Sequence, residues 1–382
     1  MVYRSKVALV SLEYGEGGVG GSVRRIAYNL RHNSREPHVI TVTTSRSNID
    51  RFDEGFHVHK YGPFTGNLKS VPAKELRRFL NFITHLEKRY KYDLFHIFTL
   101  FPAGYLVGKF CKVRGKPCII NARGDDCDRD LANDSIRDKI KGFGDEHTYV
   151  FMNSRMKDNF LCLFNKGMKE RIATSCFVIP NSIDPSLFTD YNTKRKGPER
   201  ITIGTVGEFR RGKGLPYLLE AFRTFRGKTE GCDAQLEIIG YFRESHYKER
   251  IMEYIRKTGL DESVKITGKI PHENMLGYLS NLDIFVLPSN EEGSSNALLE
   301  AMYAGCACIA TDVYGNREIV TTDDEGILVQ RENPSAITAA LSSLCDPQKR
   351  KMMGRCAKRR IRDAFLPEHE IKRWCEVYKC AR

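Results

Sequence analysis

Two glutamates, Glu292 and Glu300, flank a short polar run within residues 288–305. The run consists of Ser294, Ser295 and Asn296. Either serine can cap a helix that Gly305 ends, which places Glu292 in the preceding loop and Glu300 inside the helix. Eight residues of helix span about 12 Å, so the two carboxylates cannot share one metal ion. They can bind hydroxyls at both ends of a ligand whose anionic middle meets the helix amides, as in a nucleotide sugar.

A basic loop follows an expected strand at residues 201–206 and precedes a helix expected to begin at Leu215. Its notable residues are Gly207, Glu208, Arg210, Arg211, Lys213 and Gly214. Lys213 would lie beside the helix N-terminus, where exposed amides and cationic side chains bind a diphosphate. The loop lacks the Walker spacing, because no hydroxyl follows the lysine to hold magnesium. A basic surface loop without a ligand is the alternative.

A glycine-rich turn lies between the first expected strand and the first expected helix. Its glycines include Gly18, and the spacing of Gly15, Gly17 and Gly20 formally satisfies the dinucleotide fingerprint. The fingerprint also needs an acidic residue about 20 positions further on, and residues 43–46 contain none. Of the dinucleotides, only NADP is compatible with this turn, with its 2′-phosphate bound by Arg46. An NADP-dependent oxidoreductase is therefore one alternative function. The glycines can otherwise let a ligand approach the backbone, or form a tight turn.

Short runs rich in Val and Ile alternate with stretches of helical period, a pattern typical of α/β domains with parallel sheets. In the first half, strands are expected at 6–12, 39–43, 94–98 and 118–121, with helices near 22–30 and 73–90. In the second half, strands are expected at 201–206, 235–239, 264–267, 284–287 and 307–310, with helices near 215–225 and 247–258. The polar segment 182–200 has linker composition. We therefore expect domains at 1–190 and 191–365, and a final helix at 366–382.

The length and charge of the chain bound its function. Its 382 residues suffice for about two domains that each bury a core. Lys and Arg number 61 against 48 Asp and Glu, and the net charge of +13 suits an anionic acceptor or weak contact with an anionic membrane. The helix near 73–90 has an apolar and a basic face, which indicates core packing more than membrane binding. No nucleic-acid-binding motif accompanies the charge, so nucleic acid is not an expected partner.

Cysteine and histidine usage predicts no metal. The 12 cysteines are scattered, often within apolar runs, and are expected to be reduced core thiols. No Cys-x-x-Cys pair occurs, and the ten histidines do not stand at ligand spacings along the sequence. No run approaches the ~20 apolar residues of a membrane-spanning helix. We expect a cytoplasmic protein, peripheral at the inner membrane face at most.

These motifs resemble those of the family-4 retaining glycosyltransferases of the GT-B architecture, and the similarity extends over essentially the whole chain. Glu292 and Glu300 match the family's pair of glutamates separated by seven residues, and residues 207–214 match its phosphate loop. Residues 178–184 and 315–318 are also similar. The resemblance implies two Rossmann-like parallel-sheet domains facing across a cleft, with a C-terminal helix crossing back to the N-terminal domain.

The resemblance also implies an activity and assigns residues to it. The activity is hexosyl transfer, with retention and without metal or cofactor, from a nucleoside-diphosphate sugar, UDP- or GDP-linked rather than ADP-linked. The acceptor would be a glycan or lipid-linked molecule of polysaccharide or glycolipid synthesis. The catalytic residues would be Glu292, Lys213 and Arg210. The donor-binding residues would be Glu300, Gly207, Arg211, Ser294, Ser295, Asn296 and Gly240. The acceptor side would use Gly17, Gly18, Gly20, His96, Arg123 and Asp125.

Some residues depart from the family pattern. Glu208 stands where the family's phosphate loop has arginine, so we expect it to point away from the donor while Arg210 or Arg211 supplies the charge. Arg123 stands where many relatives have histidine, and it could touch the donor or an anionic acceptor. His96 ends a buried-looking strand, and a core role is its alternative. A nucleotide-sugar epimerase or a phosphorylase of the same architecture is the nearest alternative function.

Overall fold

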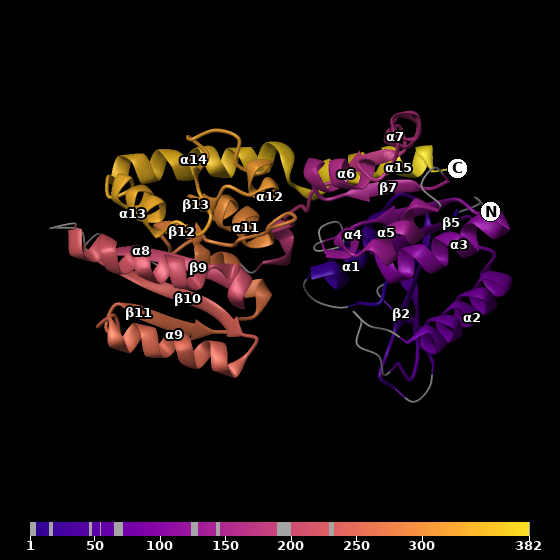
Figure 1. Ribbon diagram of the computed structural model, residues 1–382, viewed down its shortest axis with the longest axis horizontal. Coiled ribbons are helices and arrows are strands. Elements are labelled where there is room, and N and C mark those ends of the chain that lie inside the picture. Colours follow the sequence, from indigo (N-terminus) through magenta and orange to yellow (C-terminus); the bar gives the residue numbers. More distant parts are fainter. Residues whose placement is uncertain are drawn as a thin grey trace. The chain divides into compact units, whose positions relative to one another are not determined.

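The computed structural model describes residues 5–14, 18–45, 48–53, 55–64, 72–123, 129–142, 146–188, 200–228 and 233–381. The chain divides into two compact units (Figure 1). Unit 1 comprises Met1–Ile179 and Ile371–Arg382, and unit 2 comprises Pro180–Glu370. The domain boundary predicted near residue 190 lies outside the described residues. No helix in the described ranges is both long enough and apolar enough to cross a bilayer.

Unit 1 contains an eight-stranded sheet in the order β3-β4-β2-β1-β5-β6-β7-β8, parallel except for the antiparallel β3. The strands are β1 (Lys6–Val10), β2 (Glu36–Val42), β3 (Ile49–Asp53), β4 (Phe56–Tyr61), β5 (Leu94–Phe98), β6 (Cys118–Asn121), β7 (Thr148–Phe151) and β8 (Cys176–Val178). Alternate residues of β1 enter two different buried clusters, Val10 in one and Leu9 in the other. The sheet is therefore covered on both faces, as the continuous apolar runs of its strands predict.

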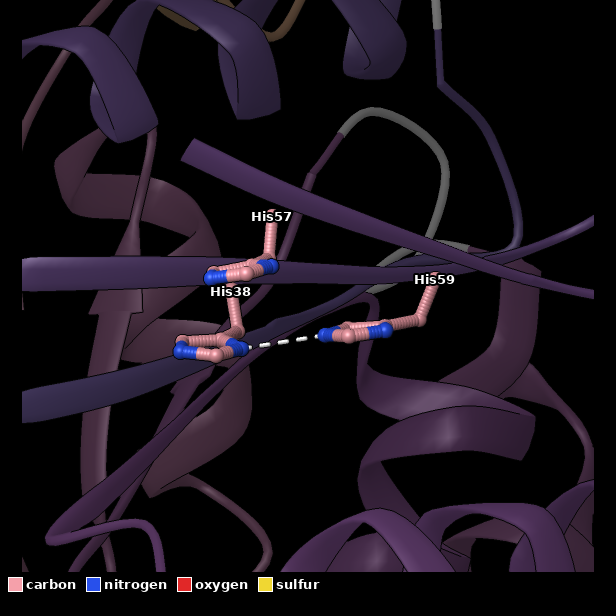
Figure 2. Close-up of side chains that lie close together, drawn as sticks. All are labelled: His38, His57 and His59. Atoms are coloured by element: carbon pink, nitrogen blue, oxygen red, sulfur yellow. Dashed lines mark hydrogen bonds between the residues drawn. The ribbon is translucent and has the colours of Figure 1, made fainter. Parts of the chain in front are cut away.

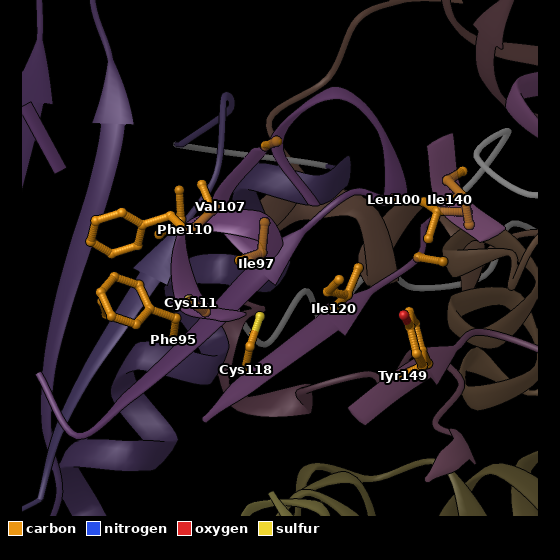
Figure 3. Packing of buried hydrophobic residues seen from close by; sticks show 14 of the residues in the cluster. Phe95, Ile97, Leu100, Val107, Phe110, Cys111, Cys118, Ile120, Ile140 and Tyr149 are labelled. Carbon is orange, nitrogen blue, oxygen red and sulfur yellow. The ribbon is translucent and has the colours of Figure 1, made fainter. Parts of the chain in front are cut away.

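The helices of unit 1 are α1 (Gly18–His32), α2 (Ala73–Tyr90), α3 (Tyr105–Arg114), α4 (Arg129–Ala132), α5 (Asp134–Lys141), α6 (Ser154–Leu161) and α7 (Lys166–Ala173). A short π-helical turn, Leu100–Gly104, precedes α3. The apolar face of α2 packs into the core through Phe79, Ile83 and Leu86, which confirms the core-packed interpretation of this helix. Figure 3 shows the same cluster around β5 and β6, where the rings of Phe95 and Phe110 lie 5.7 Å apart.

The last helix, α15 (Pro367–Cys380), brings the C-terminal segment back to unit 1 (Figure 1). Trp374, Val377 and Tyr378 are buried against the sheet face that includes Val7 and Leu9. The predicted return of the C-terminal helix to the N-terminal domain is thus confirmed. Because the apolar side chains of α15 complete this cluster, the core of unit 1 is built from both ends of the chain.

Unit 2 contains a six-stranded parallel sheet in the order β11-β10-β9-β12-β13-β14. The strands are β9 (Ile201–Phe209), β10 (Ala234–Phe242), β11 (Val264–Gly268), β12 (Ile284–Leu287), β13 (Ala307–Thr311) and β14 (Ile327–Val329). The helices are α8 (Leu215–Lys228), α9 (Ser245–Lys257), α10 (Met275–Leu279), α11 (Asn296–Ala304), α12 (Tyr314–Arg317), α13 (Pro334–Ser343) and α14 (Pro347–Ala364). The expected α/β class with two Rossmann-like parallel sheets is confirmed.

Several element boundaries differ from the sequence-based expectation, and those of α1, β9 and β10 concern predicted site residues. α1 begins at Gly18, earlier than the expected residue 22, so Gly18 and Gly20 lie in its first turn. β9 continues to Phe209, because β10 pairs with it as far as the partners Phe242 and Phe209. Gly207 and Glu208 therefore belong to a strand rather than to the loop, and Gly240 lies inside β10.

Candidate active site

The basic loop of unit 2 is a 3₁₀ turn, Arg211–Lys213, between β9 and α8. It ends at Gly214, whose φ of 65° is in the left-handed region that favours glycine. A Cβ atom at Gly214 would lie 1.9 Å from the carbonyl oxygen of Pro288, the first residue after β12. The backbone N–H of Asn290 donates to the carbonyl of Gly212 at 2.9 Å. The two loops that carry the predicted site are therefore locked together through their backbones.

Lys213 and Glu292 meet across these loops. The Lys213 ammonium donates to the Glu292 carboxylate at 2.7 Å, and the side chains are 24% and 11% exposed. Glu292 lies in the loop before α11, as predicted. A charge-assisted hydrogen bond that is partly shielded from water is stronger than one on an open surface, so each side chain holds the other in place. The structure thus brings together two of the three residues predicted as catalytic.

α11 begins where the spacing of the polar run predicts. Ser295 is the N-cap, its hydroxyl accepting from the Leu298 amide, and Gly305 ends the helix with φ 89°. The Ser294 hydroxyl accepts from the backbone N–H of Asn181, whose side-chain amide donates to the Asn296 side chain. These side chains therefore hold the loop in position. Because the first amides of a helix have no acceptor within it, backbone N–H groups are the donors this segment offers to an anion.

Glu300 lies inside α11, as predicted, and is only 6% exposed. Its carboxylate is 2.9 Å from Nε2 of His272, a half-exposed residue that begins the short 3₁₀ turn before α10. The ring of Phe188 lies 4.9 Å from the His272 ring. His272 was not predicted from the sequence, because it belongs to none of the motifs and is distant from Glu300 along the chain.

The remaining charged residues of the loop point in different directions. Arg210 precedes the 3₁₀ turn and Arg211 begins it, and both side chains are exposed. Glu208 is paired with Arg243, which follows β10, with 3.6 Å between Glu208 Oε1 and Arg243 Nε. Arg243 is a second residue that sequence analysis missed. The partner of Glu208 is therefore a cation at the end of the neighbouring strand, and Lys213 is paired elsewhere.

The residues predicted for the acceptor side lie in unit 1. His96 is fully buried, its Nδ1 is 2.7 Å from the Tyr378 hydroxyl, and its pKa is lowered well below the usual value by burial and then by Arg123. The structure thus gives His96 the core surroundings that were its alternative interpretation. Arg123 is 5% exposed and donates to the Ser22 hydroxyl on α1 at 3.0 Å. Gly17 and Asp125 lie outside the described residues.

Comparison with known proteins finds a family match in unit 2. Residues 189–360 match the family described as Glycosyl transferases group 1. An N-acetylgalactosamine-N,N'-diacetylbacillosaminyl-diphospho-undecaprenol 4-alpha-N-acetylgalactosaminyltransferase of Campylobacter jejuni is 29% identical over 194 residues, 49% of each chain. A 2-deoxystreptamine N-acetyl-D-glucosaminyltransferase of Niallia circulans is 23% identical over 312 residues, 76% of this chain and 77% of its own. The chain spans about half the length of the first curated relatives it matches.

Solved structures share the fold of the whole chain. Sucrose-phosphate synthase of Thermosynechococcus elongatus superposes with a TM-score of 0.77 at 19% identity, over 98% of both chains. Anabaena Alr3699/HepE, solved with UDP and glucose, superposes with a TM-score of 0.75 at 15% identity, over 99% of this chain and 100% of its own. The fold is therefore of the GT-B class, with two Rossmann-like units. The match to the Glycosyl transferases group 1 family is confined to residues 189–360.

Proposed function

We propose that this protein is a retaining glycosyltransferase that moves a hexosyl group from a nucleoside-diphosphate sugar to a glycan or lipid-linked acceptor. The observation that carries the proposal is the Lys213–Glu292 pair at 2.7 Å, built from two backbone-locked loops with Glu300 eight residues further along the chain. A cation, a helix N-terminus and two separate carboxylates match the diphosphate, the sugar and the ribose of one elongated donor.

Each residue has a distinct role in this proposal. Lys213 contacts the donor diphosphate, with Arg210 and Arg211 exposed close by to add positive charge. Glu292 accepts hydrogen bonds from hydroxyls of the donor sugar, and Glu300 accepts them from the ribose. His272 is a positioning residue, since its ring contacts the Glu300 carboxylate at 2.9 Å. These cations and amides neutralise the leaving diphosphate, so the reaction needs no metal.

In the proposed mechanism no side chain acts as the nucleophile. The acceptor hydroxyl attacks the anomeric carbon on the face that the diphosphate leaves. The departing phosphate oxygen takes the hydroxyl proton, so the configuration is retained and the charges balance. The protein contributes orientation and stabilisation of the leaving anion. Mass spectrometry should therefore find no sugar covalently bound to Glu292, and such an adduct would overturn the mechanism.

The acceptor class rests on charge and on relatives. The net charge of +13 favours an anionic acceptor. The Campylobacter jejuni relative is named for transfer to a sugar on diphospho-undecaprenol. We therefore propose an acceptor of polysaccharide or glycolipid synthesis, presented as a lipid-linked phosphate or a glycan. Contact with a membrane would then depend on the basic surface, because the apolar face of α2 is used by the core.

Thermal unfolding with a panel of UDP-, GDP- and ADP-sugars, with NADP and NAD alongside, tests the donor. A ligand at 100 times its Kd adds about 2.7 kcal/mol, which raises the midpoint by roughly 5–10 °C in units of this size. We expect a UDP- or GDP-sugar to raise the unfolding midpoint. Glu300→Gln should lower the affinity for this donor at least tenfold, and substitution of the exposed Glu262, Glu262→Gln, should leave the affinity unchanged. A response to NADP alone, or donor turnover that needs no acceptor, would contradict the proposal.

A further inference from the structure

Three histidines lie together on one face of the sheet of unit 1, although their positions in the sequence indicated no metal site. His38 on β2 is the register partner of His57 on β4, and His59 follows two residues later on the same face. Figure 2 shows the rings in nearly parallel planes, with His59 bonded to His38. Each ring offers one nitrogen to a set that lies within 4.8 Å. His38 and His59 are fully buried, and Tyr90 at the end of α2 packs against all three rings.

A carboxylate oxygen lies close to the outer nitrogen of each ring of the buried pair. Nε2 of His38 is 3.0 Å from Glu36, and Nδ1 of His59 is 2.9 Å from Asp50. The inner nitrogens, Nδ1 of His38 and Nε2 of His59, are 3.0 Å apart. A carboxylate on the far nitrogen of each ring is the arrangement that orients imidazoles toward a metal ion.

The two inner nitrogens can both present a lone pair to a metal ion. A neutral imidazole carries one N–H group and one lone pair. When the N–H of each ring is on its outer nitrogen, beside Glu36 or Asp50, the lone pairs on Nδ1 of His38 and Nε2 of His59 face each other at 3.0 Å. A cation between them removes the repulsion.

We propose that His38, His57 and His59 bind a divalent transition-metal ion of the zinc type in the N-terminal unit. Imidazole nitrogen is a preferred ligand of Zn²⁺, and two carboxylates in outer positions compensate part of its charge. Zinc–nitrogen bonds of about 2.0–2.1 Å place tetrahedral ligand atoms about 3.4 Å apart, so the inner pair must open by about 0.4 Å. The half-buried His57 must turn its ring out of the stack to supply the third nitrogen.

The surroundings provide an entry path and a further oxygen. A cavity of about 490 Å³ beside the cluster is lined by residues that include Asp50, His59 and His85. The Tyr92 hydroxyl lies 3.4 Å from Nδ1 of His38, and it or a water molecule can complete the coordination. The cluster lies toward the amino-terminal ends of β2 and β4, whereas open α/β sheets bind their substrates at the carboxyl ends. The ion would therefore join β2 to β4 and have no part in sugar transfer.

Zinc titration of the untagged full-length chain, stripped with EDTA, tests the proposal. Calorimetry and metal analysis should find one bound zinc ion per chain. His57→Gln should lower the zinc affinity at least tenfold. His57 is half-buried, and circular dichroism checks that this variant is folded. The matched control is His85→Gln, an exposed histidine lining the same cavity, which should bind like the unaltered chain. At 100 times its Kd, zinc should raise the midpoint of unfolding by roughly 5–10 °C in the unaltered chain and in the control.

The cysteines are the main competing ligands, and they are the same in all three proteins. Equal zinc affinity in the unaltered chain and in His57→Gln would overturn the proposal, as would no binding at micromolar zinc. Cobalt substitution in the unaltered chain gives an answer that needs no variant. A visible spectrum of imidazole-bound Co²⁺ without thiolate charge-transfer bands supports the site, and thiolate bands alone would overturn it. None of these readouts depends on glycosyl transfer.

Discussion

Replacing Gly214 by alanine should damage both the fold and the function of unit 2. Its φ of 65° costs a residue with a side chain about 1–2 kcal/mol. The new Cβ would also lie 1.9 Å from the Pro288 carbonyl oxygen, where real Cβ contacts stay above 3.0 Å, so one backbone must retreat by about 1.1 Å. That movement would separate the two loops that carry Lys213 and Glu292. We expect a loss of at least about 2 kcal/mol, equivalent to a fall in Tm of roughly 4–8 °C.

The neighbouring Gly212 is the matched control. A Cβ there meets nothing within 4 Å, and its φ is not in the left-handed region. Gly212→Ala should change Tm by at most about 2 °C and leave the KM for the donor within twofold. Gly214→Ala should raise that KM at least tenfold, measured on protein that is still folded at the assay temperature. Equal effects of the two substitutions, or no effect of either, would refute the argument that the loops are locked at Gly214.

Other predictions concern a cap, a buried hydroxyl, a buried imidazole and the surface charge. Ser295→Ala removes the N-cap hydrogen bond of α11 and should lower the free energy of unfolding, measured by thermal unfolding, by about 1 kcal/mol. Ser295→Asp should retain most of this stability. Tyr378→Phe leaves Nδ1 of His96 without its partner and should lower the free energy of unfolding by about 1–3 kcal/mol. Unfolding can be measured by the fluorescence of Trp374, the one tryptophan of the chain. Burial lowers the pKa of His147 to about 4 from 6.5, so the stability it contributes is complete above pH 6.5 and is lost as pH falls toward 4. Relative to His147→Gln, the unaltered chain should lose on the order of 3 kcal/mol across that window in denaturant titrations, and parallel curves would contradict this. Co-sedimentation with anionic vesicles should fall as sodium chloride rises, and no binding at low salt would exclude the membrane contact.

The part of the site that could be predicted from sequence is the part that local rules determine. The capping preference of serine, the left-handed preference of glycine and the spacing of the glutamates place Glu292 before α11 and Glu300 within it. The parallel sheets follow in the same way from apolar runs separated by helical periods. Each of these signals lies within about 20 residues of sequence.

The missing parts depend on pairing between distant segments. β9 continues through Gly207 and Glu208 because β10 pairs with it there. The sequence of β9 alone does not contain this information. His272 reaches Glu300 only through the packing of α10 on α11. The histidine cluster was overlooked for the same reason, since the register of β2 against β4 brings His38 to His57.

Because α15 completes the core of unit 1, unit 2 is an insertion within unit 1 rather than a domain that follows it. The chain leaves unit 1 at Ile179 and re-enters it at Ile371. The bond between His96 and Tyr378 closes a loop of 282 residues, which is far larger than the distances that link most contacts in fast-folding domains. During synthesis, the first strands of unit 1 must therefore wait, with the part of one apolar face that α15 covers still exposed, until all of unit 2 has been made. A fragment ending at residue 179 would keep that part of the face exposed, and we expect it to aggregate unless a peptide of residues 371–381 is supplied.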